Sequence, residues 1–369
     1  MAVVAPGCWL LPGTGWRLVF VSPFLFPTRM KPVNLKRLAR ELNVSIATVS
    51  RALQDSHEVA PATKERVRAL AAALHYEPNA YASSLRRNQS KTIGVLIPKV
   101  TNHFFALAIN GIEEAARQAN YHVLIYLTHD SYEREVSIIQ HLRGGRIDGL
   151  LVSLASSTED FSHLQSLADN NVPLVFFDRV CDDIPTAKVT TNDYECGYQA
   201  TEHLLAAGCL HIAHLQISGN LSISRNRHQG YLDALQANGH DPEPDLTLQG
   251  TMNNEENLVL IRDMMQRRPD IDGIFASVER MAVGTYHVCR ELGRAIPQDV
   301  KIVGFSNLES VSLLDPPLTT ITQPAYNIGR EAARILLHAL EKKRTIQPSQ
   351  SVVLPSELVR RQSSRVVRG

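Results

Sequence analysis

Small hydroxyl side chains and one arginine stand at helical spacing in the stretch "ELNVSIATVSRAL" (residues 41–53). Ser45, Thr48 and Ser50 lie near the start of a short apolar-periodic segment, and Arg51 follows about one turn later. Hydroxyl groups near a helix N-terminus suit phosphate oxygens, and a guanidinium can bind a guanine edge through two hydrogen bonds. These residue types predict contact with duplex DNA. The spacing alone also fits a plain three-helix bundle that binds nothing.

Three helices must position those side chains. In the first, the apolar residues follow the i, i+3, i+4, i+7 spacing of one helix face: Leu35, Leu38, Ala39 and Leu42. Asn34 is a natural N-cap for it, and Asn43 tolerates the left-handed backbone that a tight turn between helices needs. Ser45 is then suited to cap the second helix.

The second helix is expected to turn one face inward and the other outward. Val44, Val49, Ala52 and Leu53 pack back on the first helix, which leaves an exposed set: Ser45, Ile46, Ala47, Thr48, Ser50 and Arg51. A third helix is expected to begin at Pro61, a proline suited to a first helical turn. Its predicted inner face consists of Val67, Leu70, Ala71 and Leu74. This arrangement is a helix-turn-helix.

Charge is unevenly distributed along the 369 residues, whose net charge is +1. Residues 30–91 hold eleven Lys or Arg and five Asp or Glu, a balance of about +6, whereas residues 92–369 hold 25 and 32, a balance of about −7. A basic head on a mildly acidic body predicts a polyanion partner for the head alone. The five cysteines (8, 181, 196, 209 and 289) are scattered and form no C-x2-C pair, so we expect reduced thiols in a cytosolic protein and no metal site.

Residues 1–29 differ in composition from the rest of the chain, because they are apolar, rich in Gly and Pro, and lack acidic residues. The first basic residue, Arg17, comes too late for the charged start of a signal peptide. Arg17 and Pro23 also interrupt the run of ~20 apolar residues that a membrane span needs. Since Met30 is a plausible start, we interpret residues 1–29 as a misassigned start or a disordered extension rather than a targeting segment, and we expect no membrane partner.

A short linker, "EPNAYASSLRRNQS" (residues 77–90), comes after the three helices. Pro78 stops the third helix, and Asn79 can cap a new short helix that includes Leu85. Such a helix is too short to persist alone in water. Two copies side by side in a minor groove could order each other, whereas the alternative has Leu85 packing the linker on the body.

From Thr92 onward, short apolar runs alternate with helical patterns. "TIGVLIP", "HVLIYLT", "IDGLLVSL" and "VPLVFFD" are typical of buried parallel strands, and the alternation predicts a doubly wound βαβ lobe. The pattern restarts after Thr190, and "IDGLLV" (147–152) is echoed by "IDGIFA" (271–276). The glycines at 197, 208 and 230 are expected to serve structure.

Two stretches carry a resemblance to a known family: "NLKRLARELNVSIATVSRAL" (34–53) and "ATKERVRALAAALHYEPNAYASSLRRNQSKTIGVLIP" (62–98). They are similar to the lactose-repressor (LacI/GalR) family of bacterial transcription regulators, and the resemblance runs from about Val33 to the end. It implies that Ile46 and Ala47 are the variable base-reading positions and that Leu85 is a wedge that kinks the duplex. Ser45, Thr48, Ser50 and Arg51 would be near-constant phosphate and base contacts. Arg37 and Asn43 depart from the usual acidic residue and Gly. We interpret Arg37 as a solvated surface charge, and the alternative is one added phosphate contact.

The resemblance further implies two lobes like those of periplasmic binding proteins, with an effector between them. By resemblance, the residues that bind it are Phe104, Phe105, Asp178, Arg227, Met252, Glu279, Ser306 and Gln323. Arg227 offers a planar donor fork suited to hydroxyls or a carboxylate, and its alternative role is a surface ion pair. Phe104 and Phe105 could instead be core at a helix start.

Three departures leave the effector's identity open. Ser306 in "GFS" replaces an acidic group of many sugar-binding relatives, Glu279 replaces Asp, and Met252 lies where some relatives present an aromatic ring. A sugar or sugar phosphate is the default by family weight. No Gly-rich phosphate loop, HExxH, GxSxG or paired-acid motif is present, so we expect no enzyme, no catalytic residues and no cofactor.

The sequence therefore predicts a helix-turn-helix head and a two-lobed α/β body with doubly wound parallel sheets. The expected ranges are 1–29 (extension), 30–76 (head), 77–91 (hinge), 92–189 with 323–350 (first lobe), and 190–322 with 351–369 (second lobe). The expected function is that of a homodimeric, cytoplasmic, nucleoid-associated bacterial repressor that binds a pseudo-palindromic operator and a small-molecule effector. A transport-type solute-binding protein is the alternative, although it would carry a strong signal peptide and no helix-turn-helix.

Overall fold

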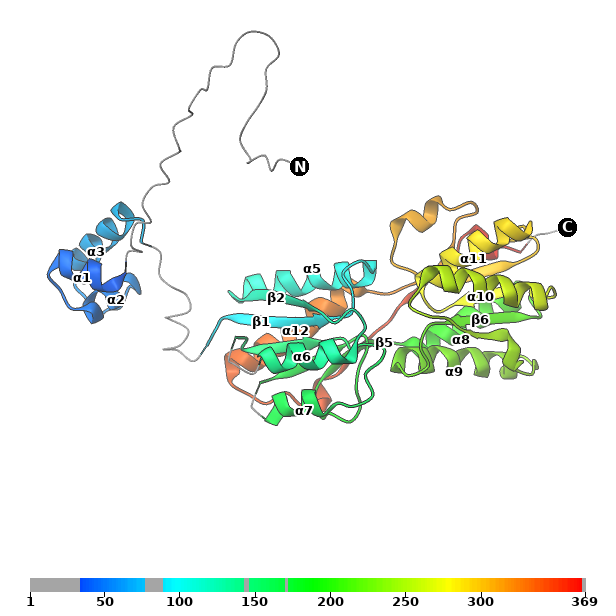
Figure 1. Cartoon of the computed structure of the whole chain (residues 1–369), viewed down its shortest axis with the longest axis horizontal. Helices are drawn as coiled ribbons and strands as arrows, with labels where there is room; N and C mark the ends of the chain where they lie inside the picture. The colour runs from blue at the N-terminus through cyan, green and yellow to red at the C-terminus, as the bar shows by residue number, and fades with distance from the viewer. Residues whose placement is uncertain (1–33, 77–88, 143–145, 170–171, 367–369) are drawn as a thin grey trace, which may run out of the picture. The chain divides into compact units, whose positions relative to one another are not determined.

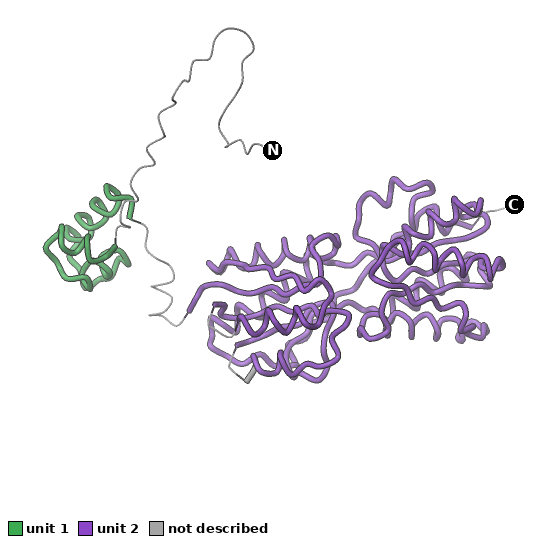
Figure 2. Tube along the Cα trace, in the orientation of Figure 1, with its two compact units in different colours: residues 1–79 green, residues 80–369 purple. Residues whose placement is uncertain are grey.

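The computed structural model describes residues 34–366, except 77–88, 143–145 and 170–171. The chain forms two compact units, residues 1–79 and 80–369, and each is described separately (Figure 2). Residues 1–29 and the two hinge residues, Asn79 and Leu85, lie outside the described residues, so their predicted roles stay predictions.

Three helices form the head: α1 (Leu35–Leu42), α2 (Ile46–Leu53) and α3 (Pro61–Ala73). The side chain of Asn34 caps α1 by accepting from the amide of Arg37 at 3.0 Å. Asn43 ends α1 in the left-handed conformation, with φ 56° and ψ 43°. The predicted N-cap and the predicted left-handed turn are both confirmed.

The head is held together by one small apolar cluster. Leu38, Val49, Ala52 and Val67 are fully buried in it, and Ala71 is nearly so. The other predicted inner residues pack against this cluster while partly exposed: Val44, Leu53, Leu70 and Leu74. The predicted inner faces of α2 and α3 are thereby confirmed.

The first lobe of the body contains a six-stranded sheet in which all neighbouring strands are parallel. Its strand order is β11 (Val352–Leu354), β5 (Lys188–Thr191), β4 (Leu174–Phe177), β3 (Gly149–Val152), β1 (Thr92–Ile97) and β2 (His122–Leu127). Its helices are α5 (His103–Gln118), α6 (Tyr132–Leu142), α7 (Ser162–Asp169) and α12 (Ala325–Lys342). Side chains alternate across the sheet, so that Val95 packs with α5 and α12 while Leu96 packs with α6 and α7.

The second lobe repeats this plan with one antiparallel edge strand. Its strand order is β12 (Glu357–Val359), β10 (Thr319–Thr322), β9 (Lys301–Phe305), β8 (Gly273–Ala276), β6 (Ile212–Gln216) and β7 (Thr247–Gln249). Its helices are α8 (Asp193–Ala206), α9 (Ser222–Ala237), α10 (Asn254–Arg267) and α11 (Glu279–Leu292). Short 3-10 turns complete the body at Pro244–Leu246, Glu309–Leu313, Pro348–Gln350 and Gln362–Ser364. The predicted fold class is confirmed.

The chain crosses between the lobes three times, from β5 to α8, from β10 to α12 and from β11 to β12 (Figure 1). The third crossing differs from the expected boundary at residue 351, because Val352–Leu354 pairs with β5 of the first sheet. The chain therefore enters the second lobe only after Leu354. The boundary was missed because a strand of three residues gives no sequence signal for its parallel pairing with a strand far away in the chain.

In the second lobe, α8 and α9 approach each other closely through two glycines. A Cβ at Gly197 would overlap the carbonyl oxygen of Arg227, and a Cβ at Gly230 would overlap the carbonyl oxygen of Tyr194. The Tyr194 hydroxyl also donates to Asp233 at 2.8 Å. These two glycines are structural, as expected, because no side chain fits at the crossing.

In the first lobe, α5 and α12 approach each other closely through two glycines in the same way. A Cβ at Gly329 would overlap the carbonyl oxygen of Ala108, one at Gly111 would overlap that of Tyr326, and the Tyr326 hydroxyl donates to Glu114. These residues occupy the same positions from their helix starts as the set in α8 and α9. The two lobes therefore share a helix-pair core as well as the strand echo seen in the sequence.

Candidate DNA-binding surface and effector site

The N-terminus of α2 is closed by its own hydroxyl residues. The Ser45 Oγ accepts from the amide of Thr48 at 3.0 Å and lies 2.9 Å from the Thr48 Oγ1. This is an ordinary N-cap, which satisfies one of the free amides of the first turn. It also fixes both hydroxyls on the outer side of the helix start.

The exposed face of α2 carries the predicted base-reading residues. Ile46 is 43% exposed, Ala47 is exposed, and Ser50 is half-buried. The Arg51 side chain is 55% exposed and forms an ion pair with Glu58 at 3.1 Å. Exposed pairs of this kind contribute only about 0–1 kcal/mol, so Arg51 can leave Glu58 for a stronger acceptor at small cost.

Other cations of the head are engaged within it. Lys64 and Arg68 both bind the Asp55 carboxylate, at 3.0 and 2.7 Å, and their hydrogen bonds and charges lower the pKa of Asp55. Arg37 pairs with Glu41 on the solvent side of α1 at 2.9 Å. The interpretation of Arg37 as a solvated surface charge fits this geometry.

The predicted effector residues all lie near strand carboxyl ends or helix starts of the two lobes, which we call the inter-lobe face. Phe104 and Phe105 lie in the first turn of α5, Asp178 follows β4, Glu279 opens α11 and Ser306 follows β9. The remaining three are Arg227 in α9, Met252 after β7 and Gln323 after β10. In open α/β sheets this is where ligands bind.

Arg227 is buried, with 3% of its surface exposed. Its Nε and Nη2 both approach the Asp193 Oδ1 at 2.7 Å, and its Nη1 donates to the Ser277 carbonyl at 2.7 Å. The guanidinium also stacks on the Phe305 ring, 3.6 Å from its centroid. A surface ion pair is therefore excluded, and Asp193, which the sequence did not single out, holds Arg227 in place.

Asp178 is buried at the end of β4 and has a left-handed backbone, with φ 60°. Burial raises the pKa of Asp178 to about 6, although the charges of Arg179 and Arg227 act in the opposite direction. The Arg179 Nε lies 4.0 Å from this carboxylate. Asp178 therefore keeps its proton to a higher pH than an exposed aspartate does.

Phe104 and Phe105 are 5% and 1% exposed and meet edge to face at 5.3 Å. Phe105 also contacts Phe177 of β4 edge to face at 6.4 Å. Asn102 fixes this helix start, because its side chain accepts from the amide of Phe104 at 3.0 Å. Both rings belong to the core of the first lobe, which favours the role of core at a helix start over that of a binding surface.

Glu279 and Ser306 come together although they are far apart in sequence. The Ser306 hydroxyl donates to the Glu279 Oε2 at 2.5 Å and accepts from the amide of Leu308 at 3.1 Å. The serine hydroxyl therefore orients the Glu279 carboxylate. Met252 is half-buried, and its carbonyl accepts from the Arg280 Nη1 at 3.1 Å.

Gln323 lies in the second crossing between the lobes. Its Nε2 donates to the Thr191 Oγ1 at 3.3 Å, and its carbonyl accepts from the Asn307 side chain at 2.6 Å. At the neighbouring crossings, the amide of Ser356 donates to the Asn192 side chain at 2.8 Å. Gln323 is thus part of the connection between lobes as well as a candidate ligand contact.

Four charged residues of the inter-lobe face escaped the sequence prediction: Asp130, Arg179, Asp193 and Arg280. Each directly follows, or lies within four residues after, the carboxyl end of a strand. This position after a strand is the sequence feature by which the four residues could have been found. Binding of an effector by any of these residues, predicted or newly found, stays a prediction.

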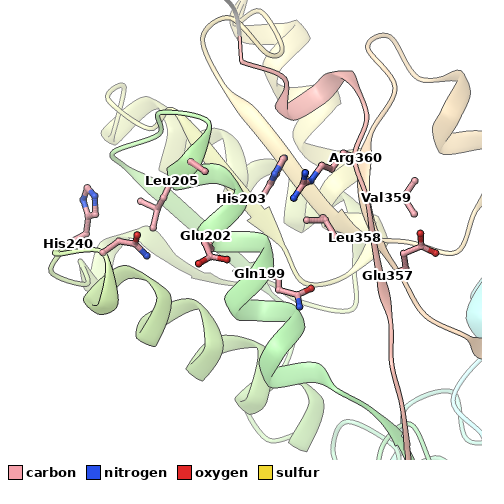
Figure 3. A pocket seen from close by; sticks show the side chains of 11 residues that line it. Gln199, Glu202, His203, Leu205, His240, Glu357, Leu358, Val359 and Arg360 are labelled. Atoms are coloured by element: carbon pink, nitrogen blue, oxygen red, sulfur yellow. The ribbon is translucent and has the colours of Figure 1, made fainter.

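A separate groove of about 1080 Å³ lies between α8 and β12 of the second lobe (Figure 3). Its polar lining includes Glu202, His203, His240, Glu357 and Arg360. None of the eight predicted effector residues lines it. Within the described residues, no group of three or more His, Cys, Asp or Glu could hold a metal ion, and no helix is long and apolar enough to span a membrane.

Comparison with known proteins matches the two units to two family descriptions. Residues 34–79 match "Bacterial regulatory proteins, lacI family", and residues 90–359 match "Periplasmic binding proteins and sugar binding domain of LacI family". The chain is 30% identical over 332 residues to the ribose operon repressor of Halalkalibacterium halodurans, covering 90% of this chain and 97% of that protein. It is 31% identical over 313 residues to the repressor PurR of Vibrio atlanticus, covering 84% and 92%.

Solved structures agree with these matches. The chain is similar to the Lac repressor dimer bound to operator and the anti-inducer ONPF, with a TM-score of 0.79, 26% identity, and coverage of 91% of this chain and 100% of that one. It is also similar to the transcriptional regulator CelR in complex with cellobiose, with a TM-score of 0.69, 27% identity, and coverage of 90% and 99%. The chain belongs to the LacI family of bacterial DNA-binding transcriptional regulators.

Proposed function

We propose that this regulator is a homodimeric repressor that binds a pseudo-palindromic operator and releases or holds it according to an effector bound at the inter-lobe face. The observation that carries the DNA-binding half is the α2 surface: a hydroxyl-capped helix start, exposed Ile46 and Ala47, and an Arg51 held only by a weak exposed pair. Such a helix fits the major groove by its N-terminal residues.

The proposed division of labour follows from contact chemistry. Ser45, Thr48 and Ser50 contact phosphates, Arg51 contacts a guanine edge, and Ile46 and Ala47 contact neighbouring bases. The hinge residues Asn79 and Leu85 complete the DNA-binding set, with Leu85 entering the minor groove as a wedge.

The proposed effector contacts are the six predicted residues other than the two core phenylalanines, together with Asp130, Arg179, Asp193 and Arg280. Charged and polar groups of both lobes gather there around the buried Arg227–Asp193 pair. The Lac repressor and CelR structures carry small molecules by their descriptions, and this supports a sugar-like ligand. The ligand binds the body more tightly at one angle between the lobes than at the other, and so shifts the protein toward that angle. The change in angle alters the distance between the hinge segments of the two protomers.

Self-association of two copies is proposed for the body. The edge strand β2, with exposed Leu124 and Ile125, supports it, because an exposed sheet edge can be covered by a second copy. Because its proposed partner is operator DNA, we propose that the working protein is in the bacterial cytoplasm and associated with the nucleoid. No catalytic step is part of this proposal.

The test is selection of binding sites from a random duplex pool by the purified full chain. We expect recovery of an inverted-repeat sequence bound by a dimer, with the apparent Kd measured by gel shift and the stoichiometry by sedimentation. Equal, salt-sensitive binding to every duplex would contradict the proposal.

A further inference from the structure

The aspartate of the repeated "IDG" motif has the same task in both lobes. Asp148 lies directly before β3, Asp272 lies directly before β8, and both are half-buried. Each carboxylate accepts hydrogen bonds from the two backbone amides that precede the first strand of its lobe, β1 or β6. The two lobes differ in which segment of the chain this aspartate holds.

In the first lobe the held residues are Ser90 and Lys91. The Ser90 amide donates to the Asp148 Oδ1 at 2.5 Å, and the Ser90 hydroxyl donates to the same oxygen at 2.8 Å. The Lys91 amide donates to the Asp148 Oδ2 at 2.9 Å, and the Asp148 amide donates to the Thr92 carbonyl at 2.7 Å. Both oxygens of one carboxylate are therefore used to fix the direction of the backbone at this point.

Lys91 is also held from the side of β2. Its carbonyl accepts from the His122 amide at 2.8 Å, and its ammonium lies 4.3 Å from the centre of the Tyr121 ring. Lys91 has a left-handed backbone, with φ 52°. A residue other than glycine adopts this conformation at a cost, and it persists where the surrounding contacts impose it. The contacts with Asp148 and with the start of β2 thus determine the bend at Lys91.

In the second lobe the corresponding aspartate holds a turn inside the body. The Leu210 amide lies 3.1 and 2.8 Å from the two Asp272 carboxylate oxygens, and the His211 amide donates to Oδ1 at 2.9 Å. The chain arrives there from α8 through a turn in which Gly208 has φ 90°. Since α8 and β6 belong to the same lobe, we expect Asp272 to affect the stability of that lobe alone.

The segment that Asp148 holds comes from the head. The head helices end with α3, and Thr92 opens β1, so Ser90 and Lys91 are the residues by which the chain from the head enters the body. Selective binding requires each head to reach its half-site at a set spacing, whereas non-specific binding requires only phosphate contacts. Backbone freedom at the entry point would be lost on selective binding, and that loss would weaken it.

We infer that Asp148 is a positioning residue for operator binding, because it fixes the point at which the chain from the head enters the body. The inference rests on the proposed function, since it concerns affinity for an operator. This role requires no contact between Asp148 and DNA. The carboxylate removes conformational freedom from Ser90 and Lys91 before DNA is bound, and so raises the ratio of operator affinity to non-specific affinity.

The test compares these two affinities in the full chain. Fluorescence anisotropy measures the Kd for the operator selected from the random pool and for a scrambled duplex of the same length, at one salt concentration. We expect D148A to weaken operator binding about tenfold and to change binding to the scrambled duplex less than about twofold, because only selective binding orders the entry point. The lost negative charge acts on both duplexes alike, so the ratio of the two Kd values is insensitive to it.

D272A is the matched control, because it removes the corresponding backbone hydrogen bonds in the second lobe. We expect D148A and D272A to lower the Tm similarly, and only D148A to lower the ratio. S90A removes the hydroxyl but leaves both amides on Asp148, so the ratio should stay within about twofold of wild type. D148N, which retains one acceptor oxygen, supplies the same comparison should D148A not fold.

Hydrogen exchange followed by mass spectrometry reports the contact itself. In the absence of DNA, peptides that cover residues 90–97 should exchange faster in D148A than in wild type, and peptides of the second lobe should not. The inference fails if exchange rises there while the ratio of affinities stays at the wild-type value. It also fails if D272A lowers the ratio as much as D148A, because a general loss of stability then explains the effect.

The same measurements keep this inference apart from the proposed function. If the wild type selects no operator, the proposed function is overturned. If the wild type selects an operator and D148A keeps the full ratio, only the role of Asp148 is overturned.

Discussion

Replacing Arg227 by methionine tests the buried centre of the inter-lobe face. The change keeps most of the side-chain volume but removes both contacts to Asp193, the bond to the Ser277 carbonyl and the stack on Phe305. Asp193 is 3% exposed and retains only the Thr191 hydroxyl, at 3.0 Å, among its described side-chain partners. Since one partner of a buried pair is removed and the other charge remains, we expect a loss of about 3–5 kcal/mol.

The measurement is urea unfolding followed by circular dichroism at fixed protein concentration, because self-association would otherwise change the apparent stability. The matched control is R262M, whose pair with Glu291 is partly exposed, so that about 0–1 kcal/mol is expected. The double variant R227M/D193N should be more stable than R227M alone, because it removes the uncompensated charge. A loss below about 1 kcal/mol for R227M, or no recovery in the double variant, would refute the argument that this pair is buried and coupled.

Three further predictions concern DNA binding and pH. R51A should weaken operator binding by about 1–3 kcal/mol and relax selectivity at one base pair, whereas R37A should leave selectivity unchanged; competition gel shifts on single-base operator variants measure both. L85A should weaken specific binding while non-specific binding persists, and an unchanged operator Kd would count against the wedge. Because the folded-state pKa of Asp178 is raised to about 6, the folded protein binds this proton more tightly than the unfolded chain. Its contribution is fully present below the unfolded pKa of about 3.8 and is lost as pH rises through about 6, a change of about 3 kcal/mol that D178N should abolish in urea unfolding between pH 4 and 7.

Local chemistry explains which parts of the structure were predictable. The left-handed Asn43 and the N-caps Asn34 and Ser45 depend on residues within four positions of each other, so the sequence contains all the information needed. The alternating strands and helices of the body were equally predictable from the sequence, because each buried strand is a continuous apolar run. The residues that follow the strands were predicted as effector contacts from the family resemblance and not from their spacing.

What escaped prediction depends on contacts across long stretches of chain. Arg227 and Asp193 belong to different helices, and only the close approach of α8 and α9 brings them together. Val352–Leu354 joins the first sheet through pairing with a strand more than a hundred residues earlier. Phe105 looks the same in sequence whether it lines a site or, as here, packs against Phe177.

The glycine crossings limit where the body can bend. At Gly197 and Gly230 in one lobe, and at Gly111 and Gly329 in the other, main chain lies directly on main chain, with no flexible side chain between to absorb a shift. Each helix pair must then travel as a solid block with its sheet. Any change in the angle between the lobes must therefore arise in the three segments that connect them, where the chain is in neither a helix nor a strand.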